Sequence, residues 1–290
     1  MTTAALTRRD GSRAGGVRAI LQSEFAQAWE LANINPIENT FVLSRIESAM
    51  SEPWRLGGSL WGYFTGNGLE SLLFVGANIV PAQTTTRARE EFARELITTG
   101  RRSSSILGPL DQLMDLWERI RPVWGNPREV RPNQPLMIID SAPQCARDHR
   151  VRRVNPDELS VLLPASIHMF THEVGVSPIA HGGREQYERR VAEVIEQRFA
   201  FAVITDGQVL FKAEIGFISG GIAQLQGVWV APHFRGQGFA APAIAQVVEI
   251  IQAEHVGTVS LYVNDFNEPA LSAYRRVGFR EVGSFATVLF

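Results

Sequence analysis

The most constraining feature of the sequence is a segment in which an apolar run passes through a glycine-containing turn into an amphipathic helix. The run ends at residues 228–230, the turn holds Gly236 and Gly238, and apolar side chains then recur on one helical face. Pro242 falls in the first turn of this helix, where its missing N–H costs nothing. The segment predicts a buried strand followed by a helix, and so an α/β protein.

The turn has the chemistry of a phosphate-binding loop. Backbone N–H groups ahead of a helix point outward and, with the positive end of the helix dipole, form a site for a pyrophosphate. Gly236 and Gly238 let the backbone approach phosphates without a Cβ in the way. A P-loop is excluded because its lysine and hydroxyl residue are absent, and a dinucleotide Rossmann motif because the Gly-x-Gly-x-x-Gly spacing is not met.

A second motif lies downstream. Asn267 is a natural N-cap and Gly278 a natural C-cap of a short helix that contains Tyr274. The arrangement Asn-x-x-Ala-x-x-x-Tyr-x-x-x-Gly-Phe follows the loop pattern Arg-x-x-Gly-x-Ala. In this order and spacing the two motifs resemble the signature of the GNAT superfamily of N-acetyltransferases. The resemblance covers residues 150–290.

The resemblance implies a GNAT fold, in which a mixed, mostly antiparallel sheet is flanked by helices. Two parallel strands, here those ending at Val230 and Asn264, would splay apart and admit the pantetheine arm of acetyl-coenzyme A. Tyr274 would protonate the departing thiolate. The coenzyme-binding residues that the resemblance implies are Val228, Trp229, Val230, Arg235, Gly236, Gln237, Gly238, Phe239, Ala240, Ala241 and Asn267.

The general base is open. Many family members carry a carboxylate on the strand before the loop, but this chain has Gln224 and Gln226 there, and glutamine cannot act as a base. Glu214, which interrupts an otherwise apolar strand, is the first choice, and Glu173 is another candidate. A third option is direct attack by an amine that is already neutral.

Composition argues against several classes of function. A formal net charge of −2 gives no electrostatic basis for binding nucleic acid or an acidic membrane surface. Cys145 is the only cysteine, which excludes an intrachain disulfide and a thiolate-based metal site, and we expect no metal cofactor. No apolar stretch has the length of a signal peptide or a membrane span, so we expect a cytoplasmic protein. The oligomeric state is open, a homodimer included.

The first half of the chain predicts a second domain. Residues 1–16 are small, polar and arginine-rich, which predicts disorder, and residues 17–140 predict an α/β domain. Strands at 59–64 and 72–80 flank an Asn-Gly turn, and residues 121–135 predict a proline-rich connector. The order of elements echoes the second half.

This first domain is predicted to be a degenerate GNAT-like fold or an unrelated α/β fold. Residues 82–87 stand where the phosphate loop should follow, and they contain no glycine, so they cannot cradle a pyrophosphate in the same way. The layout resembles GNAT proteins that pair an uncharacterised N-terminal region with an active C-terminal domain. The first domain would then shape or cover the acceptor site.

The leading hypothesis is an N-acetyltransferase that transfers acetyl from acetyl-coenzyme A to a primary amine by direct attack. The backbone near residues 228–230 would stabilise the oxyanion, and Tyr274 would be the acid. The alternative is a non-catalytic acyl-coenzyme A sensor or interaction protein, which the missing strand carboxylate and the large second domain favour. The acceptor and the acyl chain length are not specified by the sequence.

Overall fold

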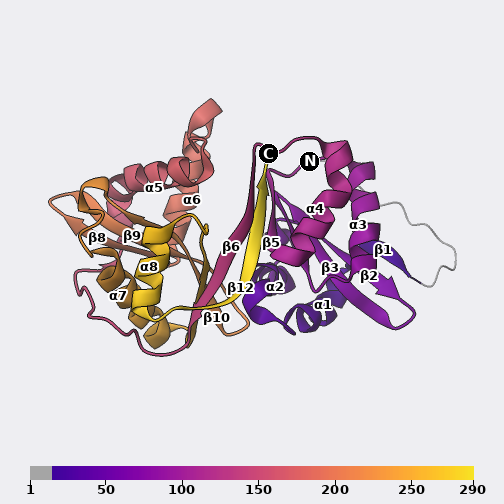
Figure 1. Cartoon of the computed structure of the whole chain (residues 1–290), viewed down its shortest axis with the longest axis horizontal. Coiled ribbons are helices and arrows are strands. Elements are labelled where there is room, and N and C mark those ends of the chain that lie inside the picture. Colours follow the sequence, from indigo (N-terminus) through magenta and orange to yellow (C-terminus); the bar gives the residue numbers. More distant parts are fainter. Residues whose placement is uncertain (1–14) are drawn as a thin grey trace. The chain divides into compact units, whose positions relative to one another are not determined.

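The computed structural model describes residues 15–290 and divides the chain into two units (Figure 1). The first unit comprises the residues up to Pro135 together with Gly283–Phe290, and the second comprises Leu136–Val282. Residues 1–14, and with them nearly all of the segment predicted to be disordered, lie outside the described residues. Gly16, the last residue of that segment, begins strand β1.

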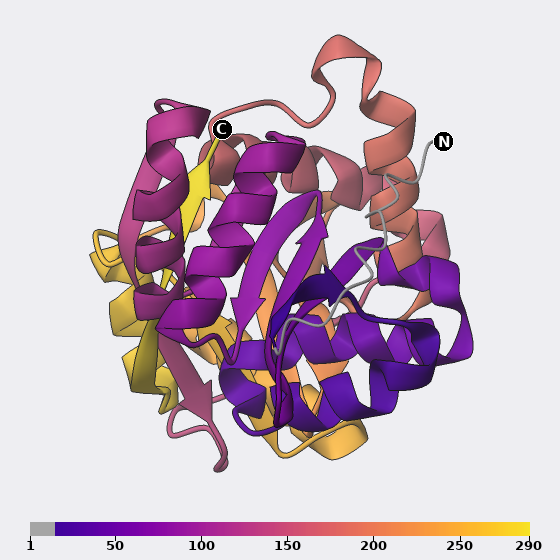
Figure 2. The same ribbon diagram turned by 90° about the vertical axis from the view of Figure 1, so that its right-hand side faces the viewer.

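The first unit is a sheet in the order β1-β2-β3-β4-β5-β12, in which only β4 and β5 run parallel. Helices α3 and α4 lie side by side against it (Figure 2). The strands are β1 (Gly16–Ala19), β2 (Gly58–Thr65), β3 (Gly68–Gly76), β4 (Asn78–Ala82), β5 (Ser105–Pro109) and β12 (Arg280–Leu289). The helices are α1 (Phe25–Ala32), α2 (Pro36–Ser51), α3 (Thr86–Thr99) and α4 (Leu110–Trp124).

The second unit repeats this order of elements, in the sheet order β7-β8-β9-β10-β11-β6, and only β10 and β11 run parallel. The strands are β7 (Arg152–Arg153), β8 (Ala200–Thr205), β9 (Gln208–Ser219), β10 (Ile222–Val230), β11 (Thr258–Tyr262) and β6 (Glu129–Ile139). The helices are α5 (Leu159–Val174), α6 (Arg184–Glu196), α7 (Ala240–Glu254) and α8 (Glu268–Val277).

Two cores fix the faces of the second sheet. Alternate residues of β8 point to opposite sides, as a pleated strand requires. Phe201 and Val203 pack with α7 and α8, whereas Ala200 and Ala202 pack with α5 and α6. The sheet therefore lies between two helix pairs, and the predicted mixed, mostly antiparallel sheet with flanking helices is confirmed.

The last strand of each half of the chain lies in the other unit's sheet. Strand β6 follows α4, yet its end pairs with β11, with Ile139 opposite Val259. Strand β12 follows α8, yet its end pairs with β5, with Phe285 opposite Pro109. The sequence pattern did not predict this exchange.

Two local predictions in the first half were wrong. The apolar run 72–80 is not one strand, because the chain reverses between Gly76 and Asn78 and β3 and β4 then pair antiparallel. The predicted connector 121–135 instead contains the last turn of α4, with Pro122 inside the helix, and the start of β6. Within residues 15–290, no helix is both long and apolar enough to cross a membrane.

Candidate active site

Strands β10 and β11 separate in the second unit. They pair only where Ile222–Gln224 lie opposite Thr258–Ser260. Beyond this point neither strand has a partner in the other, so the backbone of the last part of β10 faces a gap. An unpaired strand edge inside a sheet can hydrogen-bond an extended ligand, as the pantetheine arm of a coenzyme would require.

A bulge lies on β10 beside this gap. Gln226 is opposite Glu214 on β9, but the next pair is Trp229 with Lys212, so β10 carries one extra residue. Gly227 has a positive φ of 60°, a conformation that strongly favours glycine. The bulge turns the backbone of Gly227 and Val228 out of both ladders.

The loop after β10 presents unused donors. Gly236 and Gly238 have φ values of 76° and 75°. Within the described part of the chain, the N–H groups of residues 236–239 donate no hydrogen bond. Helix α7 begins at Ala240, so its positive end adds to these donors, and the loop can bind a phosphate group.

The side chains of this loop shape it from within. Arg235 Nε donates to the Val230 carbonyl at 3.0 Å, and Gln237 Nε2 donates to the His233 carbonyl at 2.7 Å. These two residues thus hold the turn, while their backbone faces outward. Phe239 and Ala240 pack partly against the core and Ala241 is buried.

Tyr274 lies on α8, with 6% of its surface exposed. Burial, and secondarily the nearby Glu173 carboxylate, raises the pKa of the Tyr274 hydroxyl above its usual range. The hydroxyl has no hydrogen-bond partner among residues 15–290. Asn264 Nδ2 donates to Glu173 Oε1 at 3.3 Å, which links the end of α5 to the segment that follows β11. Tyr274 therefore stays protonated at neutral pH and can donate a proton.

Asn267 is placed as the N-cap of α8. Its side chain accepts a hydrogen bond from the Ala270 N–H at 3.3 Å, which is the capping role that its position predicted. Contact with a coenzyme stays a prediction.

Glu214 lies on the face of the sheet that α5 and α6 cover. Its side chain is 12% exposed, accepts from Gln226 Nε2 at 3.2 Å, and pairs with Lys212 at 3.4 Å and with Arg190 at 3.8 Å. Tyr187 lies close by, and burial together with Glu214 raises the pKa of its hydroxyl to about 12. The structure therefore brings Glu214 to the bulge, in a polar cluster that the sequence analysis did not predict.

Lys212 is the member of this cluster that sequence reasoning missed. It is the only lysine in the chain, and just 1% of its surface is exposed. A signal was present, because residues two apart on a strand share a face and Lys212 precedes Glu214 by two.

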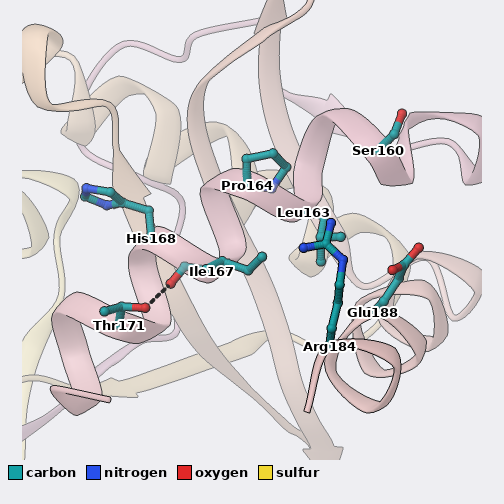
Figure 3. A pocket seen from close by; sticks show the side chains of 8 residues that line it. All are labelled: Ser160, Leu163, Pro164, Ile167, His168, Thr171, Arg184 and Glu188. Atoms are coloured by element: carbon teal, nitrogen blue, oxygen red, sulfur yellow. Dashed lines mark hydrogen bonds between the residues drawn. The ribbon is translucent and has the colours of Figure 1, made fainter. Parts of the chain in front are cut away.

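A cavity of about 610 Å³ lies on the second unit, between α5 and α6 (Figure 3). Its walls include His168, Ile167 and Leu163 of α5 and Arg184 and Glu188 of α6. The Trp229 indole N–H donates to His168 Nδ1 at 3.2 Å, which links one wall of the cavity to β10. None of the residues that line the cavity belongs to the phosphate-loop segment 231–239, to β10 or to α8. Among residues 15–290, no group of three or more metal-ligating side chains occurs.

Comparison with known proteins agrees with this geometry. Residues 168–279 match the acetyltransferase (GNAT) family, and residues 58–162 match a domain of unknown function (DUF4081). A GCN5-related N-acetyltransferase from Sphaerobacter thermophilus is 15% identical, with 96% of each chain covered and a TM-score of 0.59. A GNAT-family acetyltransferase from Colwellia psychrerythraea is 12% identical, with 94% of this chain and 99% of that chain covered and a TM-score of 0.58.

A third solved structure bears on the first unit. A tandem GNAT protein from the clavulanic acid biosynthesis pathway is 14% identical, with 95% of this chain and 98% of that chain covered and a TM-score of 0.56. At such identities the likeness shows the fold. The second unit is thus a GNAT acyltransferase domain. The chain therefore carries a GNAT acyltransferase domain over residues 168–279, and residues 58–162 match a domain of unknown function.

Proposed function

We propose that the chain transfers an acetyl group from acetyl-coenzyme A to a primary amine by direct attack. The observation that carries this proposal is the loop of residues 236–239, whose unused N–H groups lie directly after the separated part of β10. A pyrophosphate on this loop places the pantetheine arm along the gap.

Acetyl-coenzyme A supplies the activated acyl group, and the residues of the gap would act on it in turn. The amine nitrogen attacks the thioester carbonyl carbon, and the backbone N–H of Val228 donates a hydrogen bond to the carbonyl oxygen as negative charge develops on it. When the carbon–sulfur bond breaks, the Tyr274 hydroxyl donates its proton to the thiolate. Its raised pKa keeps the hydroxyl protonated beforehand.

The amine must lose a proton during attack, and Glu214 is the proposed acceptor. The carboxylate lies beside the bulge, opposite Gln226. It also accepts a hydrogen bond from Gln226 Nε2 at 3.2 Å, which orients it at the bulge. A water molecule between the amine and Glu214 would serve as well as direct contact.

Calorimetric titration with acetyl-coenzyme A tests the coenzyme site. Gly238→Trp introduces a bulky side chain at a residue with φ 75° and is expected to lower the affinity at least about tenfold, because it strains the loop and covers its donors. Gly207→Trp is the matched control, since Gly207 has φ 72° and open space around it at the tip of the β8–β9 hairpin. Absence of binding by the wild type, or equal losses in both variants, would contradict the proposal.

A second candidate, a non-catalytic acyl-coenzyme A sensor, is favoured by one observation. Strand β10 carries no carboxylate, and the nearest one, Glu214, is already paired with Lys212. Release of free thiol from acetyl-coenzyme A in the presence of a panel of amines separates the two functions. Binding without amine-dependent thiol release would support the sensor.

A further inference from the structure

The buried amine of Lys212 has two acceptors. Its Nζ lies 3.2 Å from the Gly227 carbonyl oxygen and 3.4 Å from Glu214 Oε2. The site is tight, because a Cβ on Gly227 would lie 3.1 Å from the Lys212 Nζ and 3.2 Å from Glu214. Burying a cation is costly unless it is paired and hydrogen-bonded, so a fully buried lysine calls for a specific role.

The first unit shows which residues occupy the corresponding positions where the neighbouring strand has no bulge. Strands β2 and β3 repeat the register of β8 and β9, with Leu72 opposite Gly62 just as Lys212 is opposite Ala202. The positions of Lys212 and Glu214 are there taken by Leu72 and Phe74. The next strand of the first unit, β4, pairs with β3 without a shift of register. The charged pair thus accompanies the bulge and is not needed to form the hairpin.

The hydrogen bond to Gly227 acts on the neighbouring residue as well. The carbonyl of Gly227 and the N–H of Val228 belong to one planar peptide group, so fixing the oxygen also fixes the direction of the N–H. A hydrogen bond accepted by a carbonyl polarises the amide and strengthens its N–H as a donor. Neither residue has a Cα partner in the register with β9 or β11, so this peptide lies at an irregularity of the sheet.

We infer that Lys212 is a positioning residue, which holds the Gly227–Val228 peptide so that the Val228 N–H points at the acyl carbonyl. This inference rests on the proposed function, because it assigns the oxyanion donor of the same site. Lys212 does not contact the acyl group, and it acts through the peptide.

The first test compares two ligands that differ only by the acetyl group. Lys212→Met keeps the length of the side chain and removes its donors. We expect the ratio of affinities for acetyl-coenzyme A and coenzyme A to fall about tenfold, the effect of weakening one hydrogen bond. The value of kcat should also fall at least about tenfold, with KM for acetyl-coenzyme A little changed. Lys212→Arg, which retains donors, should recover part of both. An equal loss of affinity for the two ligands would indicate a structural role only and would overturn the inference.

The second test needs no coenzyme. In a nitrogen-15 NMR spectrum, Lys212→Met should shift the Val228 amide resonance, whereas Glu214→Gln, which leaves Lys212 in place, should shift it much less. An unmoved Val228 resonance in Lys212→Met overturns the inference even if the protein proves not to bind acetyl-coenzyme A. A moved resonance in a protein without acetyl-coenzyme A binding supports the held peptide and counts against the proposed function alone.

Glu214 provides the remaining control. If Lys212 acted only through its contact with the Glu214 carboxylate, the double variant Lys212→Met with Glu214→Gln would be no slower than Glu214→Gln. We expect the double variant to be slower, since the peptide is released in it as well. Equal kcat values for the two would overturn the inference.

Discussion

Strands β2 and β3 of the first unit and β8 and β9 of the second pair in the same register, down to one irregularity. In the first hairpin the register shifts between Tyr63 and Phe64, and in the second it shifts between Val203 and Ile204. The likeness continues at the first strand of each unit. Arg18 and Arg152 each pair with a glutamate six residues on, and each of these glutamates accepts from a backbone N–H at 2.9 Å.

The two units differ where the phosphate loop would be. In the first unit the strands β4 and β5 also part after a short parallel stretch, but the Pro81 ring lies against Gly108, where a Cβ would approach it to 3.2 Å. The next donors are occupied, since the Thr84 N–H donates to Gln112 at 2.8 Å and the Thr85 N–H donates to Ser71 at 3.1 Å. The corresponding loop of the second unit leaves its N–H groups unused.

This difference separates the features that the two units share from those that the proposed coenzyme site needs. The hairpins β2–β3 and β8–β9 share one register, because both bury apolar side chains and pair the backbone. The glycines of the phosphate loop, the β10 bulge and the Lys212–Glu214 pair have no counterpart at the corresponding positions in the described part of the first unit. Side chains of the first unit take up the hydrogen bonds that a coenzyme would otherwise accept, so we expect the first unit to bind no acyl-coenzyme A.

The largest expected effect comes from placing a buried lysine in the first unit, at the position that Lys212 occupies in the second unit. Leu72→Lys buries an amine in the first unit at the position of Lys212, but Phe74 stands there in place of the glutamate. We expect the free energy of unfolding to fall by about 3 to 5 kcal/mol, the cost of an unpaired buried charge. Urea unfolding followed by circular dichroism measures it. Leu72→Met, which conserves volume, should cost less than about 1.5 kcal/mol. Similar losses for both would mean that the charge finds a partner.

A smaller effect is expected from removing the hydroxyl of Tyr274 on α8. The helix that corresponds to α8 in the first unit, α4, contains no tyrosine. Tyr274→Phe should lower kcat about 100-fold through loss of the proton donor, with the affinity for acetyl-coenzyme A within about twofold. Because burial raises the pKa of Tyr274, activity of the wild type should show no loss from its ionisation below pH ~10. Tyr63→Phe, at a buried tyrosine of the first unit, is the control and should leave kcat unchanged. A Tyr274→Phe enzyme with normal kcat would remove the phenol from the mechanism.

The smallest expected effect comes from breaking an arginine–glutamate ion pair, and it should be the same in both units. The hydrogen bond from Arg18 lowers the pKa of Glu24, and that from Arg152 lowers the pKa of Glu158. A lowered folded-state pKa stabilises the protein above the unfolded value of about 4.3, and this contribution is lost as pH falls through the folded value. Glu24→Gln and Glu158→Gln should each cost less than about 1 kcal/mol at pH 7, since both arginines are nearly half exposed.

Urea unfolding at neutral and acidic pH checks this pair of variants. The difference from the wild type should shrink as pH falls below about 4.3 and should vanish once the glutamates of the folded wild type are protonated as well. A cost that persists there, or a cost in one unit only, would show that the two ion pairs are not equivalent.

Much of the site follows from local sequence signals. The positive φ values of Gly236 and Gly238, the N-cap at Asn267 and the C-cap at Gly278 are properties of single residues and their neighbours, so the motifs located them. The hydrogen bond between Lys212 and Gly227 could not be located in this way. It depends on the register of β9 with β10, and one extra residue on β10 decides it.

The exchange of last strands was also out of reach of the sequence pattern. An apolar strand such as the end of β6 has the same pattern whichever sheet it joins. The prediction of a connector at 121–135 was wrong for a local reason, because Pro122 lies in the last turn of α4, which continues to Trp124.

The exchanged strands also limit which fragments of this protein keep their sheets fully paired. A fragment of residues 150–290 would contain the loop, the bulge and Tyr274, yet it would lack the β6 residues that pair with β11. It would also carry the end of β12 without its partner β5. Both would be bare edges, prone to recruit another chain. A fragment that keeps β11 paired must therefore begin no later than Leu136, and only one that also contains β5 gives the end of β12 its partner.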